Sequence, residues 1–305
     1  MAQIQINRKK LGNVKDWVLF LSFVTLPLVQ FLIFYVFVNV NSVLLSFKIY
    51  GLNNSVRWGF DNFTRIFSAE DFPTVVNALR NSGIAFAVRA LVGMTSGLLF
   101  AYYIFKKMPG HNFFKVMLFL PTIVSSVVMV IVYSLSVEEA IPYIITGDRY
   151  TSGLISNENT KFLSVLIYNV WVGFGTQMIM YLGAMSNVSD GALEAAKIDG
   201  ANAVQEFVHV VFPGIYSTFI VFVTVHIVEF FTHQLALHTF FGFKELGNTK
   251  LYTLGYYMYR EVGLANGNFA NLTYPAALGI LCTLIAVPIT FGVRKFMFTV
   301  GPSEN

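Results

Sequence analysis

The sequence is poor in charged residues and in cysteine. Only 12% of its 305 residues are charged, whereas a soluble domain carries about a quarter. Its one cysteine, Cys282, leaves no partner for an intrachain disulfide and excludes any multi-cysteine metal site. Because Cys282 lies in an apolar run, we expect an inert, buried thiol. A composition this low in charge requires a solvent other than water.

Motifs for ATP and for nucleic acid are also missing. The sequence has no Gly-x-x-x-x-Gly-Lys-Ser/Thr loop, so we do not expect the chain itself to bind ATP phosphates or another cofactor. The net charge of +4 would suggest nucleic acid only if basic residues clustered with aromatic ones on a soluble surface. They mark the ends of apolar runs instead, which is typical of topology signals in membrane proteins.

Apolar runs dominate the sequence, which is 55% hydrophobic. Several runs reach the roughly 20 residues that cross a hydrocarbon core about 30 Å thick, and Gly- and Asn-rich segments separate them. The predicted spans are Trp17–Phe47, Val75–Phe105, Phe113–Val137, Lys161–Met185, Ile215–Thr239 and Tyr274–Phe298. The sequence therefore predicts an all-α integral membrane protein with six transmembrane helices.

The basic residues orient this bundle. The tight clusters Arg8–Lys10, Lys106–Lys107 and Arg294–Lys295 all fall on one side, close to the ends of spans. Positive charge collects on the cytoplasmic side of membrane proteins, so both termini are predicted to be cytoplasmic. The predicted organisation is a tail (1–16), a first helix with its outer loop (17–74), a core domain (75–298) and a second tail (299–305).

The segment 186–214 between the fourth and fifth spans breaks the pattern. It is too polar to cross a membrane and too apolar for a disordered linker. It predicts a cytoplasmic hairpin of two short helices divided at Asp199-Gly200, with Ser189 or Asp190 as N-cap and Pro213 ending the second helix. The alternative is an amphipathic helix lying on lipid. Such helices are rich in Lys and Arg, whereas here Lys197 stands among acidic residues.

The same segment carries a resemblance to a known family. Glu194-Ala195-Ala196, then Asp199-Gly200-Ala201, then a hydrophobic stretch closing on Pro213, resembles the "EAA" signature of type I ABC importer permeases. The carbohydrate-uptake branch, related to the maltose transporter, is the most similar. Weaker similarity covers about 17–298, including Trp171-Val-Gly-Phe, Asn81-Ser and Phe119-Leu-Pro.

The resemblance implies a transmembrane subunit in the bacterial cytoplasmic membrane, without catalysis of its own. Its expected partners are a second permease, two ATPase subunits that bind ATP and Mg, an extracytoplasmic binding protein, lipid and a carbohydrate substrate. The residues implied to contact the ATPase are Glu194, Ala195, Ala196, Asp199 and Gly200. The substrate is expected to be an oligosaccharide, with polyols and glycerol phosphates as alternatives that the sequence does not separate.

Polar residues within the apolar runs are candidates for the substrate path, because an intramembrane ionisable residue is costly without a function or a partner. We expect His226, Glu229 and His233 to share one helical face. The full candidate set is Arg89, Asn169, Trp171, Gln177, His226, Glu229 and His233. A purely structural Arg89–Glu229 pair is the alternative. The spacing of the two histidines and the glutamate would also permit a metal site, but we expect none, because no matching cluster of carboxylates or histidines lies elsewhere in the sequence.

Two other classes of protein compete with the importer. A stand-alone secondary transporter or channel predicts inverted repeats or broken helices and has no need of the hairpin at 186–214. An intramembrane enzyme needs a catalytic cluster at membrane depth, for which His226, Glu229 and His233 are the candidates.

Overall fold

The computed structural model describes residues 14–51, 55–148, 153–243 and 249–302. In this part of the chain, six helical stretches are long and apolar enough to cross a membrane, which confirms the predicted number. They are Trp17–Ser46, Phe72–Phe105, Ser126–Thr146, Lys161–Met185, Tyr216–Phe241 and Phe269–Val300. The basic cluster Arg8–Lys10 and most of the predicted tail 1–16 lie outside the described residues.

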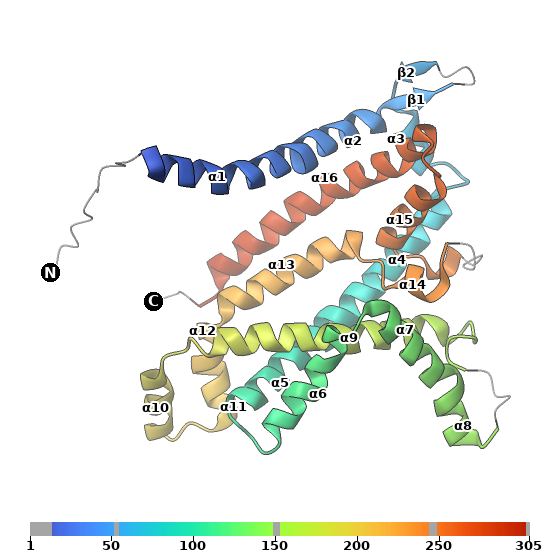
Figure 1. Cartoon of the computed structure of the whole chain (residues 1–305). Coiled ribbons are helices and arrows are strands. Elements are labelled where there is room, and N and C mark those ends of the chain that lie inside the picture. Colours follow the sequence, from blue (N-terminus) through green and yellow to red (C-terminus); the bar gives the residue numbers. More distant parts are fainter. Residues whose placement is uncertain (1–13, 52–54, 149–152, 244–248, 303–305) are drawn as a thin grey trace.

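Most spans are composed of more than one helical segment (Figure 1). The first span contains α1 (Val14–Gln30), the π-helical η1 (Phe31–Phe37) and α2 (Val38–Ser46); the second contains α4 (Phe72–Val88), π-helical η2 (Arg89–Met94) and α5 (Thr95–Phe105). The fourth is the single helix α9 (Lys161–Met185), and the sixth is α16 (Phe269–Val300). The connection after the first span holds β1 (Lys48–Tyr50), β2 (Val56–Trp58) and α3 (Asp61–Ile66), and the connection between the fifth and sixth spans holds the short 3-10 helix η5 (Thr249–Leu251) and α15 (Leu254–Leu264).

The third span differs from its prediction. The single helix predicted over Phe113–Val137 is wrong, because the chain turns extended at Val124 and Ser125. Pro121 removes a backbone donor shortly before this break, and Ser125 is a residue type favoured at helix N-caps. Helix α6 (His111–Ile123) therefore ends there, and α7 (Ser126–Leu135), π-helical η3 (Ser136–Ala140) and α8 (Ile141–Thr146) carry the span onward.

The fifth span also breaks before its predicted end. Helix α13 (Tyr216–Thr232) stops at His233, whose backbone is extended, and α14 (Leu237–Phe241) begins four residues later. Leu235 and Ala236 have φ angles of +53° and +56°. Side chains other than glycine rarely adopt such angles, so packing must impose this turn. Both Leu235 and Leu237 are fully buried, which supplies that packing.

Buried side chains form three clusters within the described residues. One cluster joins α4, α15 and α16, and includes Cys282, whose predicted burial is confirmed. The second joins α5, α9 and α13 around Tyr181 and Met178. The third joins α7, α9 and α14 around Tyr133 and Tyr168. Helices α6 and α9 approach so closely that a Cβ on Gly175 would lie 2.4 Å from the carbonyl oxygen of Leu118.

Polar contacts tie the connection between the fifth and sixth spans to the second span. The Asn81 side chain donates to the carbonyl oxygens of Lys250 and Tyr252, at 2.7 and 2.9 Å. The neighbouring Ser82 hydroxyl accepts from the backbone of Leu254 at 3.0 Å. These bonds fix the start of α15 against α4 and satisfy backbone groups that are buried away from water.

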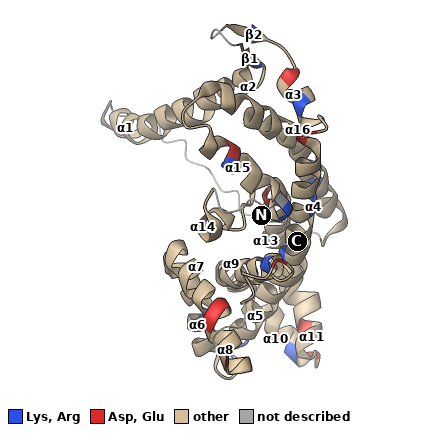
Figure 2. Cartoon of the chain, turned by 90° about the vertical axis from the view of Figure 1, so that its right-hand side faces the viewer, with Lys and Arg blue, Asp and Glu red and all other residues tan. Residues whose placement is uncertain are grey.

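The molecule has two distinct ends. The start of α1, the end of α16 and the hairpin of α10 and α11 lie at one end, while the β1–β2 hairpin, α3, α8 and α15 lie at the other (Figure 1). Lys, Arg, Asp and Glu occupy only short stretches of the ribbon, and most of each long helix carries other residues (Figure 2). This distribution is expected if the long helices run through lipid.

Candidate functional site

The segment 186–214 forms the predicted hairpin, called here the α10–α11 hairpin. Helix α10 (Asp190–Ile198) starts after Ser189 as N-cap, and α11 (Ala203–Glu206) follows the turn at Asp199-Gly200. Gly200 has a φ of +77°, so the turn uses a conformation that favours glycine. The helical run then continues through π-helical η4 (Phe207–Val211) and α12 (Phe212–Gly214), one residue past the predicted end at Pro213.

The second helix of this hairpin is held firmly at its start. The Asn202 side chain accepts from the backbone of Val204 and Gln205, while the Gln205 side chain accepts from the backbone of Asn202 at 2.9 Å. Such a capping box satisfies backbone donors that a helix start leaves free. The short α11 is therefore stabilised by its own sequence.

The hairpin presents a mixed surface to its surroundings. Glu194, Ala195, Asp199 and Gly200 are exposed, whereas Ala196 is buried. Ile198 is 86% exposed and Val204 is 70% exposed. Large apolar side chains this exposed, beside small residues that allow close approach, are typical of a protein-binding surface.

A polar cluster lies within the helices of the second, fourth and fifth spans. Arg89, the first residue of η2, donates to Glu229 of α13 at 2.7 Å. The side chain of Arg89 is 13% exposed and that of Glu229 is 29% exposed. The structure therefore brings together the two residues whose pairing the sequence left open, and the charge of each is partly neutralised by the other.

Gln177 and His226 extend this cluster. The Nδ1 atom of His226 lies 2.8 Å from the carbonyl oxygen of Phe222, which can only accept, so Nδ1 carries the proton. The other ring nitrogen then accepts from the Gln177 amide at 3.1 Å. The oxygen of that amide is buried and has no partner among the described residues. An unsatisfied buried acceptor is unusual and suits a site for a donor from outside the chain.

The remaining candidates lie elsewhere. Asn169 clamps the break after α13, donating to the carbonyl oxygens of Val165 and Leu235 at 2.8 and 2.9 Å. The prediction that His233 shares a helical face with Glu229 is wrong, because His233 lies past the end of α13 and accepts from the backbone of Leu235 at 3.0 Å. Trp171 is 39% exposed and lies near Tyr133, with ring centroids 6.3 Å apart.

An ion pair that the sequence did not predict joins Lys106 and Glu206. Lys106 caps α5, and its ammonium lies 2.8 Å from both carboxylate oxygens of Glu206, the last residue of α11. Lys106 was interpreted only as a topology signal. Its partner is 100 positions away, so no local spacing rule could have joined them.

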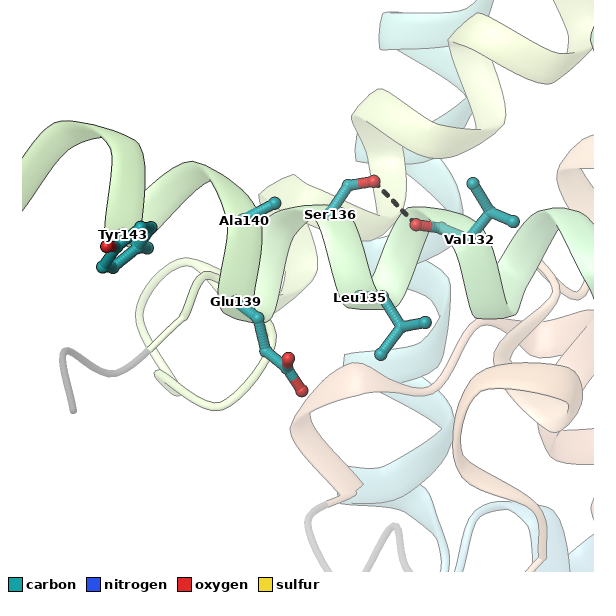
Figure 3. Close-up of a pocket in the computed structure, with 6 residues that line it drawn as sticks. All are labelled: Val132, Leu135, Ser136, Glu139, Ala140 and Tyr143. Atoms are coloured by element: carbon teal, nitrogen blue, oxygen red, sulfur yellow. Dashed lines mark hydrogen bonds between the residues drawn. The ribbon is translucent and has the colours of Figure 1, made fainter. Parts of the chain in front are cut away.

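A cavity of about 710 Å³ along the third span was also missed. It is lined by Val132, Leu135, Ser136, Glu139, Ala140 and Tyr143, all from α7, η3 and α8 (Figure 3). Glu139 is exposed on this face, while Glu138 turns away and accepts from the backbone of Ser156 at 2.8 Å. An acidic pair within an apolar run was the available signal, since such residues are rare in spans unless they have a role.

Tyrosines line the connection between the fifth and sixth spans. Burial is the largest cause that raises the pKa of Tyr256 to about 12. The phenol therefore keeps its proton and donates to the carbonyl oxygen of Gly242 at 2.7 Å. Arg260 lies over the ring of Tyr252 at 5.5 Å. Among the described residues, these tyrosines pack the end of the molecule that carries α15.

Comparison with known families gives a match over most of the chain. Residues 90–298 match the family described as binding-protein-dependent transport system inner membrane component. The match begins one residue after Arg89 and includes the α10–α11 hairpin, the polar residues of α9 and α13, and the cavity beside Glu139.

Individual relatives share the same architecture. The arabinooligosaccharides transport system permease protein AraP of Bacillus subtilis (strain 168) is 25% identical over 273 residues, covering 87% of this chain and 84% of that protein. A bacterial ABC transporter involved in the import of the acidic polysaccharide alginate superimposes with a TM-score of 0.74 at 20% identity, covering 94% of this chain and 96% of the other. That transporter is also known in complex with an alginate pentasaccharide-bound periplasmic protein, with a TM-score of 0.73 to this chain, 20% identity and the same coverage.

Proposed function

The chain belongs to the family of binding-protein-dependent transport system inner membrane components, and from this premise we propose that it conducts a carbohydrate into the cell. It is a permease subunit of an ABC importer in the bacterial cytoplasmic membrane. The carbohydrate assignment is supported by AraP, named for arabinooligosaccharides, and by the alginate importer. An oligosaccharide delivered by an extracytoplasmic binding protein is the proposed cargo.

ATP hydrolysis in this proposal takes place in partner subunits. The α10–α11 hairpin docks on an ATPase, with Ile198 and Val204 as apolar contacts and Glu194 as the acceptor for a basic side chain. Charge-assisted hydrogen bonds of this kind are stronger than neutral ones. The observation that carries the proposal is the exposure of Ile198, 86%, on a hairpin that protrudes at the end where α16 stops (Figure 1). This end is the cytoplasmic one.

The substrate path in this proposal is shared with a second permease subunit. Arg89, Gln177, His226 and Glu229 line its inner part, and the cavity beside Glu139 lines its outer part (Figure 3). The amide oxygen of Gln177 is buried and lacks a partner among the described residues, so it would accept from a sugar hydroxyl once the path opens and exposes it. The carboxylates of Glu139 and Glu229 supply further acceptors for a hydroxyl-rich ligand, and the ring of Tyr143 supplies an apolar face.

Purification from native membranes tests the proposal. A tagged copy of the chain should bring down an ATPase and a second permease in fixed ratio. Uptake into vesicles should then depend on ATP, on a binding protein and on an oligosaccharide rather than on a polyol. Capture of the chain without any ATPase would remove the importer assignment.

Substitution of Glu194 tests the docking surface. Glu194→Lys places a cation where the ATPase is expected to present one, so ATPase recovery or ATP-driven uptake should fall at least tenfold, which corresponds to about 1.4 kcal/mol. Glu70→Lys, on an exposed residue between α3 and α4, is the control and should leave both unchanged. Unaltered coupling in Glu194→Lys would exclude Glu194 from the contact.

A further inference from the structure

The ion pair between Lys106 and Glu206 is the most completely formed polar contact of the α10–α11 hairpin with the transmembrane helices. The Lys106 ammonium lies 2.8 Å from each oxygen of the Glu206 carboxylate. The Glu206 side chain is 3% exposed, and that of Lys106 is 24% exposed. A carboxylate removed from water this fully needs its partner, because desolvation of an unpaired charge is costly.

Tyr102 provides a second attachment one turn before Lys106. Its hydroxyl donates to the carbonyl oxygen of Ala203 at 2.8 Å and lies 3.4 Å from the Glu206 carboxylate. Its ring packs on Phe207, with centroids 4.9 Å apart. Residues four apart lie on the same face of a helix, so α5 holds the start of the second hairpin helix with one face.

Both helix ends favour this pair. Lys106 is at the C-terminal end of α5, where the partial negative charge of the helix attracts a cation. Glu206 lies in the first turn of the helical run that starts at Ala203, where a helix attracts an anion. The helix dipoles therefore favour a cation on α5 and an anion on α11, and would disfavour the reverse placement.

The ion pairs Lys106–Glu206 and Arg89–Glu229 join the same two helical runs. Lys106 and Arg89 belong to the run α4–η2–α5, while Glu206 and Glu229 belong to the run α11–η4–α12–α13. Each pair also lies next to a π-helical segment: Arg89 begins η2, and Glu206 directly precedes η4. Segments of this kind are frequent at functional sites.

We propose that Tyr102, Lys106 and Glu206 form a strut that transmits displacement of the α10–α11 hairpin to the second span and thereby to the Arg89–Glu229 pair. The proposal rests on the proposed function, since it requires an ATPase that moves the hairpin. With both pairs intact, α4–α5 and α11–α13 move as one body. Without the strut, the run that follows Gly200 can shift while α5 stays in place. The three residues are positioning residues, remote from the cargo.

The test measures the number of substrate molecules transported per ATP hydrolysed. The importer is purified as a complete complex, reconstituted in vesicles, and supplied with binding protein and substrate. Lys106→Met and Glu206→Gln should each lower this ratio at least about fivefold, the lower limit of typical coupling between sites. The amount of ATPase that co-purifies should stay unchanged, because neither variant replaces a residue of the proposed docking surface.

Two further variants control for a merely stabilising pair. Arg57→Gln removes an exposed ion pair with Asp61 at the opposite end of the molecule and should leave the ratio unchanged. The charge-swapped Lys106→Glu/Glu206→Lys chain should recover part of the lost ratio. The recovery is partial because each charge then lies at the wrong end of its helix.

The outcomes separate the strut from its alternatives. If the pair only stabilises the fold, transport and ATP hydrolysis fall together and their ratio does not change, which would overturn the proposal. Should Lys106→Met fail to assemble, Tyr102→Phe removes only one hydroxyl, and an unchanged ratio in that variant would overturn it equally. Absence of any ATPase from the unaltered complex would instead refute the proposed function.

Discussion

Two glutamates in this protein depend on a basic side chain from another span. Glu229 is paired with Arg89 and Glu206 with Lys106, and both acids are largely removed from water. Removing one partner of a fully buried pair leaves the other charge unpaired, which lowers the free energy of unfolding by about 3–5 kcal/mol. Glu229 keeps 29% exposure, so the cost there should be lower.

Substitution of Arg89 separates stability from transport. Arg89→Met should lower the melting temperature of the purified complex, since Glu229 loses its partner. The double variant Arg89→Met/Glu229→Leu should recover most of the melting temperature, because paired charges replaced by apolar groups are often neutral in stability. Uptake should stay impaired in the double variant, because both groups line the proposed path. Uptake that returns together with stability would make the pair purely structural.

The residues of these two pairs were not equally accessible to sequence analysis. Arg89 and Glu229 stand out because each interrupts an apolar run, and their possible pairing followed from that. Lys106 lies at the end of a span, and Glu206 lies in the segment between two spans. Charged residues are common at both places. Only the tertiary packing of α5 on α11 shows that Glu206 is buried.

At the scale of elements, the α10–α11 hairpin depends on the turn at Gly200. A Cβ at this position would meet no atom within 4 Å, so the cost of a larger residue comes from the backbone alone. The φ of +77° costs an ordinary residue roughly 1–2 kcal/mol.

Gly200→Ala should therefore loosen the hairpin without affecting the bundle. We expect ATPase recovery to fall about fivefold to thirtyfold, the equivalent of 1–2 kcal/mol, with the melting temperature of the bundle unchanged. Gly191→Ala is the matched control, because Gly191 lies inside α10 and alanine is favoured there. Equal recovery from the two variants would contradict a role for the turn.

The breaks in the third and fifth spans show where sequence patterns lose their power. The length of the apolar runs predicts the number of spans. These runs continue without interruption through Val124–Ser125 and past His233, so they do not predict the two breaks. The second break is maintained by burial of Leu235 and by the hydrogen bond from Asn169 to the Leu235 carbonyl oxygen, a contact between distant segments. Capping chemistry, in contrast, is local, which is why the hairpin of α10 and α11 was predicted closely.

At the scale of the whole molecule, the first span stands apart. The apolar 18-residue stretch within Trp17–Ser46 has no buried residue, whereas 44% of the residues in the corresponding stretch of Lys161–Met185 are buried. Of its segments, α2 packs extensively against α16, while the extensive packing of α1 within the described residues is with the η1 segment that follows it. Helix α1 extends away from the bundle along its edge (Figure 1). Lipid alone can cover such a helix, but a second permease subunit would cover it too.

Photo-crosslinking at Phe23 shows whether lipid or a second permease subunit packs against α1. Phe23 is 73% exposed on α1, so a photoreactive residue there reaches whatever packs on the helix. In the complete complex we expect an adduct with the second permease, because the proposed importer encloses its path between two permeases and α1 presents exposed apolar side chains along its length. The same chain expressed alone should give only lipid adducts. Lipid adducts from both samples would show that α1 faces the bilayer, and the interface between the permeases would then have to be formed by another face of the bundle.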